Sequence, residues 1–203
     1  MPYIKQISIH KSPKHFLRYI LRGDKNSDMK YASGVSITAD LDYAYDEFRD
    51  IYEAFSGKRF HDESKHTGNE RVRLHHYIQS FDPKDNITPE TAHDIGREWA
   101  WENFGGERQV IISTHIDKGH IHNHFAVAPY DLNGKCWYSN RSTLRTLRNS
   151  SDEIYNAWQN QQTALKSPVA PAPFVSSTLN YGNTWVVDTT INGLLIGGLS
   201  QYN

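Results

Sequence analysis

The sequence of 203 residues contains a single cysteine, Cys136, and very few methionines. One thiol excludes an internal disulfide framework, and it excludes zinc fingers built on paired cysteines. The mean hydropathy is −0.69, and the first residues lack the charged-then-apolar pattern of a signal peptide. These absences predict no membrane insertion and no secretion. We therefore expect a soluble, cytoplasmic protein.

The chain also lacks an excess of cations, because 22 Lys and Arg face 23 Asp and Glu, for a net charge of −1. Such a balance excludes a polycation that coats nucleic acid indiscriminately, so any DNA contact must be local. Cations dominate residues 1–31 and 135–148, whereas acids dominate residues 40–70. Alternation of this kind is typical of one basic face and one acidic back.

Lys and Arg are missing altogether from residues 167–203, where Asp188 is the single acid. This segment opens with SPVAPAP, a linker composition, and continues into β-branched runs with an Asn-Gly turn signal. A content of 37% hydrophobic residues allows one domain with a substantial core. We predict a domain over 1–166 and a low-charge linker and tail over 167–203, either hairpin or disordered.

Strand and helix patterns alternate before the tail. Alternating or β-branched runs predict strands, and apolar residues at helical spacing between caps and glycines predict helices. The expected strands cover 3–9, 33–37, 71–81, 108–116 and 120–129, and the expected helices cover 13–22, 41–56, 89–103 and a last stretch ending near 166. The central hairpin is antiparallel, so we predict an α+β fold with helices packed on one face of a mostly antiparallel sheet. The other face would be open to a ligand.

Histidine is unusually abundant, and four histidines fall within the segment HIDKGHIHNH. Strand alternation places His120, His122 and His124 on one face, and a turn at Lys118-Gly119 sets His115 opposite His122. Three converging imidazoles with open coordination positions are typical of a catalytic metal site. The letters HNH at 122–124 also occur in a class of nucleases, but here they run directly into the apolar strand FAVA, which disfavours that reading.

Tyr19 stands apart from the other tyrosines, because it lies off the apolar stripe of the helix expected at 13–22. It is on the polar flank, near His15 and Arg22. A phenol is a weak nucleophile at neutral pH, since its pKa is about 10. A cation-rich helix beside a metal-bound phosphate would favour the phenolate, so Tyr19 is a candidate nucleophile.

Three motifs together resemble a known family. YILRGDKN near the start, HHYIQSFDP in the middle and THIDKGHIHNHFAV after the third expected helix resemble the relaxase/mobilisation nucleases of plasmids and conjugative elements, within the HUH endonuclease superfamily. The resemblance covers about residues 1–166. It implies a ferredoxin/RRM-like core with a five-stranded antiparallel sheet.

The resemblance also implies roles for individual residues. Tyr19 would be the nucleophile, and His115, His122 and His124 would hold Mn²⁺ or Mg²⁺. Asp117 would orient a ligand histidine, and His120 would be a neighbour or alternate ligand. The implied activity is site- and strand-specific nicking of single-stranded origin-of-transfer DNA, which leaves a 5′-phosphotyrosyl bond and a free 3′-hydroxyl and initiates mobilisation or conjugation.

Contacts to DNA are expected from residues near these motifs. The resemblance points to Ser80 and, less directly, to His76. Basic residues that would bind phosphates are Lys14, Arg18, Arg71, Arg73 and Arg141. Tyr77, Trp137 and Tyr138 could stack on bases. Implied protein partners are an accessory nicking or mobilisation protein and a type IV coupling protein. The low-charge tail suggests a truncated or rearranged relaxase.

Two alternatives stay open. Another HUH enzyme, a rolling-circle replication initiator or a transposase, would carry its tyrosine after the histidine motif, where Tyr155 lies on the last expected helix. A metal-stabilised DNA-binding module that does not cleave would need no tyrosine nucleophile at all.

Overall fold

The computed structural model describes residues 1–26, 30–61, 71–117 and 119–166, together with short strands at 177–181, 184–188, 190–191 and 194–195. The chain divides into two compact units, Met1–Gln161 and Gln162–Asn203. Within the described residues, none of the helices combines the length and the apolar character that crossing a membrane requires.

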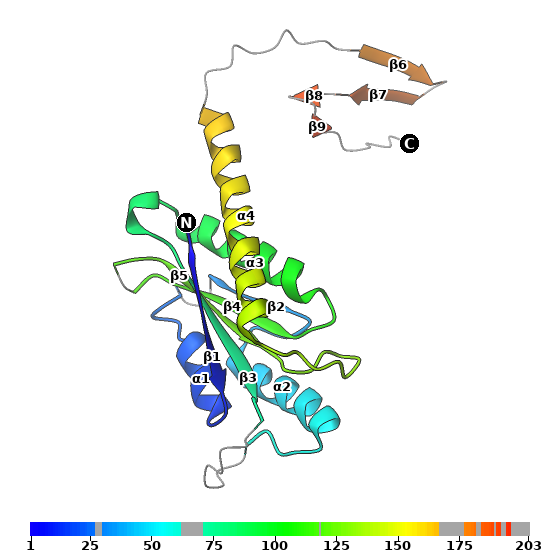
Figure 1. Ribbon diagram of the computed structural model, residues 1–203. Coiled ribbons are helices and arrows are strands. Elements are labelled where there is room, and N and C mark those ends of the chain that lie inside the picture. The colour runs from blue at the N-terminus through cyan, green and yellow to red at the C-terminus, as the bar shows by residue number, and fades with distance from the viewer. Residues whose placement is uncertain are drawn as a thin grey trace. The chain divides into compact units, whose positions relative to one another are not determined.

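The first unit is built on a five-stranded antiparallel sheet in the order β1-β3-β5-β4-β2 (Figure 1). The strands are β1 (Tyr3–Ile9), β2 (Ala32–Val35), β3 (Leu74–Ser80), β4 (Val110–His115) and β5 (His122–Val127). The helices are α1 (Pro13–Ile20), α2 (Leu41–Ser56), α3 (Pro89–Phe104) and α4 (Arg141–Lys166), with a 3₁₀ turn η1 at Pro83–Asp85. The α+β class and the antiparallel sheet predicted from the sequence are confirmed.

Local signals explain where the helices begin and end. The Asp40 side chain accepts a hydrogen bond from the Asp42 amide at 2.8 Å and so caps α2, which stops at Gly57 in a left-handed conformation. The Thr88 hydroxyl caps α3 in the same way. Ser12, which precedes α1, adopts a left-handed conformation (φ 51°) and makes no side-chain cap hydrogen bond, so Pro13 marks the helix start.

Helices cover both faces of the sheet, so the prediction of helices on a single face is wrong. On one face, α1 and α2 pack against alternate residues of the strands such as Ile111 and Ala126. On the other face, α3 and α4 pack against the intervening residues such as Ile112 and Phe125. A sheet buried on both sides explains why β4 and β5 are buried at every position.

The second unit contains two small antiparallel pairs. Strand β6 (Ser177–Tyr181) pairs with β7 (Thr184–Asp188), and β8 (Thr190–Ile191) pairs with β9 (Leu194–Leu195). The division of the chain into a nuclease domain and a separate tail stays a prediction.

Candidate metal and tyrosine site

Three histidines of the central hairpin converge beside the end of α1. His115 is the last residue of β4, and it lies directly opposite His122 on β5, which also carries His124. The predicted register is therefore confirmed. All three side chains are buried, and a nitrogen of each ring lies within 4.8 Å of the others. Strand alternation places them on the sheet face that α1 covers, the face of Ile111 and Ala126.

This arrangement fits a divalent metal ion. Three imidazole nitrogens at this spacing can bind one ion and leave coordination positions open for a substrate, as catalytic metal sites do. The ring centres are 4.3 to 5.4 Å apart. The donor set and its burial support the proposed metal role of His115, His122 and His124.

A hydrogen bond holds each of the three rings in place. Nε2 of His115 bonds the carbonyl oxygen of Ile20 at 2.8 Å, and Nδ1 of His122 lies 3.3 Å from the carbonyl oxygen of His120. Nδ1 of His124 lies 2.8 Å from Nε2 of His76. A partner on one ring nitrogen fixes which nitrogen faces a metal, so these contacts preset the ligand orientation.

His76 is part of this support, and its position differs from the expected DNA contact. Its ring is buried, stacks on His124 at an interplanar angle of 26°, and packs against Phe16. Burial lowers the pKa of His76 to about 4, so the ring is neutral near pH 7. A neutral, enclosed imidazole is suited to orienting His124 and is poorly placed to bind a phosphate.

Tyr19 lies directly against the histidines. Its ring centre is 5.7 Å from that of His115 and 5.4 Å from that of His124, with edge-to-face geometry in both cases. The tyrosine is half-buried, and it precedes Ile20, whose carbonyl oxygen bonds His115. The end of α1 therefore supplies both a phenol and a support for the metal ligands.

Lys25 is the site residue that the sequence reasoning did not single out, although the quoted motif YILRGDKN contains it. Its ammonium group lies 4.9 Å from the centre of the Tyr19 ring and 2.8 Å from a carboxylate oxygen of Asp117. The hydrogen bond from Lys25 lowers the pKa of Asp117. Asp117 was expected to orient a ligand histidine, but the structure gives it a different contact, which holds Lys25 over Tyr19.

Tyr155, the alternative nucleophile, lies elsewhere. It is buried in the core between α4 and the opposite sheet face, where its ring packs against Phe81. Burial is the main reason that its pKa is raised to about 12. A buried phenol on the far face is in the wrong place to act with the three histidines.

The asparagine of the HNH letters also has a structural role. Asn123 faces away from the flanking histidines and is fully buried. Its amide donates to Gln79 at 2.9 Å and to the carbonyl oxygen of Ala92 at 2.6 Å, and its oxygen accepts from Thr114 at 2.7 Å. These hydrogen bonds of Asn123 hold β5 against β3 and α3.

Among the residues expected to contact DNA, some lie near the three histidines and others lie far from them. Ser80 is close to the site, because it ends β3 directly opposite His122. Lys14 and Arg18 are exposed on α1, but they share a groove with Asp42 and Asp46 of α2. The acidic neighbours offset part of their attraction for phosphate.

The remaining cations are far from the histidines. Arg71 and Arg73 lie beyond the opposite end of β3 from Ser80, where Arg71 donates to the Tyr130 hydroxyl and Arg73 is buried and donates to the carbonyl oxygen of His10. Seven residues of strand separate Arg73 from Ser80 by roughly 20 Å. Arg141 begins α4, the helix that packs on the opposite face. The structure therefore does not gather these three arginines at the site.

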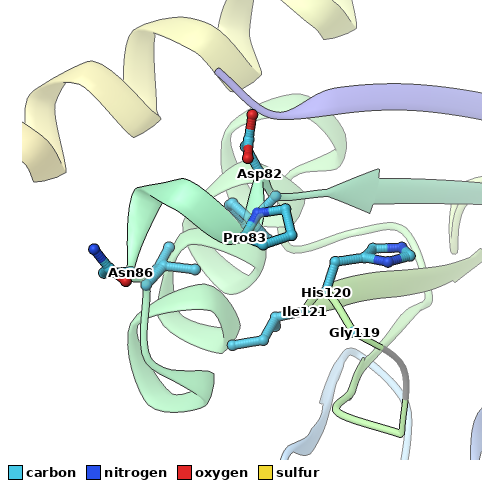
Figure 2. Close-up of a pocket in the computed structure, with 8 residues that line it drawn as sticks. Asp82, Pro83, Asn86, Gly119, His120 and Ile121 are labelled. Carbon is cyan, nitrogen blue, oxygen red and sulfur yellow. The ribbon is translucent and has the colours of Figure 1, made fainter.

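His120 connects the site to a neighbouring cavity. Its ring centre is 5.1 Å from that of His122. The same ring borders a cavity of about 430 Å³, together with residues that follow β3 (Figure 2). This placement makes His120 a neighbour of the metal ligands.

Comparisons with known proteins identify the family of this chain. Residues 19–159 match the family described as "Relaxase: MobA/VirD2-like, nuclease domain". The group II intron-interrupted relaxase LtrB of Lactococcus lactis is 40% identical over 121 residues, which cover 52% of this chain and 21% of that protein. Protein rlx of Staphylococcus aureus is 31% identical over 180 residues, which cover 88% of this chain and 48% of that protein.

Among solved structures, the MobM relaxase domain bound to 26-nucleotide pMV158 oriT DNA is similar, with a TM-score of 0.48, 16% identity, and coverage of 75% of this chain and 86% of that chain. The chain spans less than half the length of the two curated relatives. The family match includes Tyr19 and all three histidines. This chain belongs to the MobA/VirD2-like family of relaxase nuclease domains.

Proposed function

We propose that this protein nicks and rejoins single-stranded DNA at an origin of transfer, with Tyr19 as the nucleophile. The observation that carries the proposal is the contact of the Tyr19 ring with the rings of His115 and His124, at 5.7 and 5.4 Å. A phenol this close to a metal-binding cluster can reach the same phosphate that the metal holds. The nucleophile and the electrophilic site are therefore brought to one linkage.

His115, His122 and His124 would hold the divalent ion, which we propose to be Mn²⁺ or Mg²⁺. When bound, such an ion polarises a non-bridging phosphate oxygen and stabilises the charge that develops on it. The Ile20 carbonyl, the His120 carbonyl and the His76 ring keep the three imidazoles in the orientation that this requires.

The Tyr19 oxygen forms a bond to phosphorus, and the bond from phosphorus to the 3′ oxygen breaks. The phenol loses its proton, and the departing 3′ oxygen gains one. One phosphodiester replaces another, so the step is close to reversible and rejoining needs no external energy source. The Lys25 ammonium, 4.9 Å from the centre of the Tyr19 ring, would offset the negative charge of the phosphate that Tyr19 attacks.

The DNA strand is proposed to run along the end of the sheet near Ser80, which lies opposite His122. Lys14 and Arg18, exposed on the helix that carries Tyr19, are the best-placed cations for flanking phosphates. An accessory mobilisation protein and a type IV coupling protein are proposed as partners during plasmid transfer, which would take place in the cytoplasm.

Two alternatives are less well supported. A replication initiator or transposase that used Tyr155 would need a phenol that here is buried on the opposite face. A role in DNA binding alone does not explain why a half-buried tyrosine, Tyr19, lies beside the histidines.

Single-stranded DNA from the region beside the gene, labelled at its 3′ end, tests the proposal. Incubation with Mn²⁺ should attach the label covalently to the wild-type protein and to Tyr155→Phe, but not to Tyr19→Phe. His122→Ala should lose cleavage while largely keeping DNA binding. Attachment that persists in Tyr19→Phe and disappears in Tyr155→Phe would support the alternative enzyme, and binding with no attachment in any variant would leave only the binding module.

A further inference from the structure

The cavity beside His120 lies at the edge of the proposed site and has no role in it so far. Its volume is about 430 Å³, and its walls come from residues that follow β3 and residues that precede β5. We propose that this cavity, here called the β3–β5 pocket, holds one unpaired nucleobase of the DNA strand bound at the histidines. This inference rests on the proposed function and names the part of the substrate that the pocket takes.

The position of the pocket links it to the metal ligands. Ser80 is opposite His122, and the next residue, Phe81, donates its amide to the carbonyl oxygen of Ile121 at 3.1 Å. His120 borders the pocket, and its ring is 5.1 Å from that of His122. A nucleotide whose phosphate lies at the histidines would therefore lie next to the pocket.

The shape and lining of the pocket suit a flat, apolar-faced group. Phe81, Ile87 and Ile121 supply apolar surface. Pro83 lies above Ile121, and His120 lies beside Ile121 with its ring directed away from Pro83 (Figure 2). Ligand sites of this kind combine apolar walls with a few polar groups, and nucleobases stack readily on flat side chains.

The charge of the lining favours a base over a phosphate. Among the described residues that line the pocket, none is Lys or Arg, and the acid there is Asp82. One carboxylate oxygen of Asp82 already accepts the Lys84 amide at 2.9 Å. Asn86 also lines the pocket, and its side-chain amide offers both a donor and an acceptor for the polar edge of a base. We therefore expect the phosphate to bind at the histidines and the base to bind in the pocket.

Binding of two labelled single strands in the presence of Mn²⁺ separates base from phosphate. One probe is a thymidine oligonucleotide of about 12 nucleotides, and the other has the same phosphates but abasic sugars throughout. The wild-type protein should bind the thymidine strand more tightly, and Ile121→Trp, which fills the pocket, should reduce that preference by roughly 5- to 100-fold. Its affinity for the abasic strand should stay unchanged.

Pro83→Ala, which removes one flank, is the second pocket variant, and thermal unfolding confirms that both variants are folded. Tyr43→Ala removes an aromatic ring that is 62% exposed and does not line the pocket, so it should keep the base preference. Preference retained in both pocket variants, or lost only in Tyr43→Ala, would overturn the pocket while Tyr19 adduct formation still supported the proposed function. Equal affinity of the wild-type protein for the two strands would also overturn the pocket.

Discussion

At the scale of single residues, the support of the metal ligands is the feature that distinguishes this site. His124 is oriented by His76, an uncharged ring, where ligand histidines commonly bond a carboxylate or a carbonyl. A neutral partner donates less negative charge to the ligand than a carboxylate does. An ion held by the three histidines would then keep more of its positive charge for a phosphate.

His76→Gln should therefore weaken Mn²⁺ binding by about 10- to 100-fold, because it removes the group that orients His124. Titration calorimetry with Mn²⁺ measures the effect. His75→Gln is a matched control, since His75 is the preceding residue, is buried to the same degree and faces the other side of the sheet. Equal losses in the two variants would show that His76 acts only through general packing.

Lys25→Met should slow formation of the covalent DNA adduct by about 2- to 5-fold, because it removes a cation that lies over the Tyr19 ring and would offset the negative charge of the bound phosphate. Single-turnover rates measure this effect. Lys30→Met is the control, because Lys30 lies at the same 4.9 Å from the centre of the Tyr31 ring, away from the three histidines. An unchanged rate in Lys25→Met would remove the electrostatic role of this lysine.

The sequence predicted the residues of the site better than their contacts. Strand period and turn position were sufficient to place His115 opposite His122. The bond between His76 and His124 joins strands that are far apart in the chain, and it depends on β3 lying beside β5. Local pattern carries no information about that neighbour, so the contact of His76 with His124 could not be predicted from the sequence.

At the scale of elements, the close approach of α3 to β5 determines how firmly the hairpin is held. A Cβ atom added at Gly96 would lie 2.6 Å from the Asn123 amide nitrogen, which is fixed by bonds to Gln79 and to the Ala92 carbonyl. Asn123 lies between His122 and His124 on β5. The position of the two metal ligands is therefore coupled to α3.

Gly96→Ala should lower the free energy of unfolding by about 1 to 3 kcal/mol, since Asn123 must move to make room. Urea denaturation measures the loss, and the variant should also bind Mn²⁺ more weakly. At Gly119 an added Cβ meets no described atom within 4 Å, so Gly119→Ala serves as the control. Wild-type stability in Gly96→Ala would contradict the close packing.

Caps, glycines and apolar spacing in the sequence were sufficient to predict the positions of the helices and strands. They did not predict that helices cover both faces of the sheet. Strands covered on both sides are buried along their whole length, as β4 and β5 are, and they read as apolar runs in the sequence. The run VII at 110–112, in the first of these strands, fits that pattern. The polar histidines in the same strands interrupt this apolar pattern, and they favoured the expectation that one face of the sheet is open.

At the scale of the whole molecule, buried histidines make folding sensitive to acid. Burial lowers the pKa of His75 to about 4 and that of His93 to about 4, from 6.5 in the unfolded chain. The unfolded state therefore binds more protons between these values. Stability is fully present above pH 6.5 and is lost as the pH falls toward 4.

The free energy of unfolding of the metal-free protein should fall between pH 6.5 and pH 4, with each of these two rings contributing up to about 3 kcal/mol by pH 4. Urea denaturation across this range measures the slope. His93→Gln should flatten the pH dependence, even if it lowers stability at pH 7. A stability that is constant or rises toward pH 4 would contradict the buried, neutral state of these rings.

The central claim is that Tyr19 and the three histidines act on one DNA linkage. The most direct test is to identify the residue that carries the covalent DNA. After incubation with Mn²⁺ and single-stranded origin DNA, nuclease and protease digestion followed by mass spectrometry should find a nucleotide joined through its 5′ phosphate to the peptide that contains Tyr19. A nucleotide on Tyr155 or on any other residue would contradict the account.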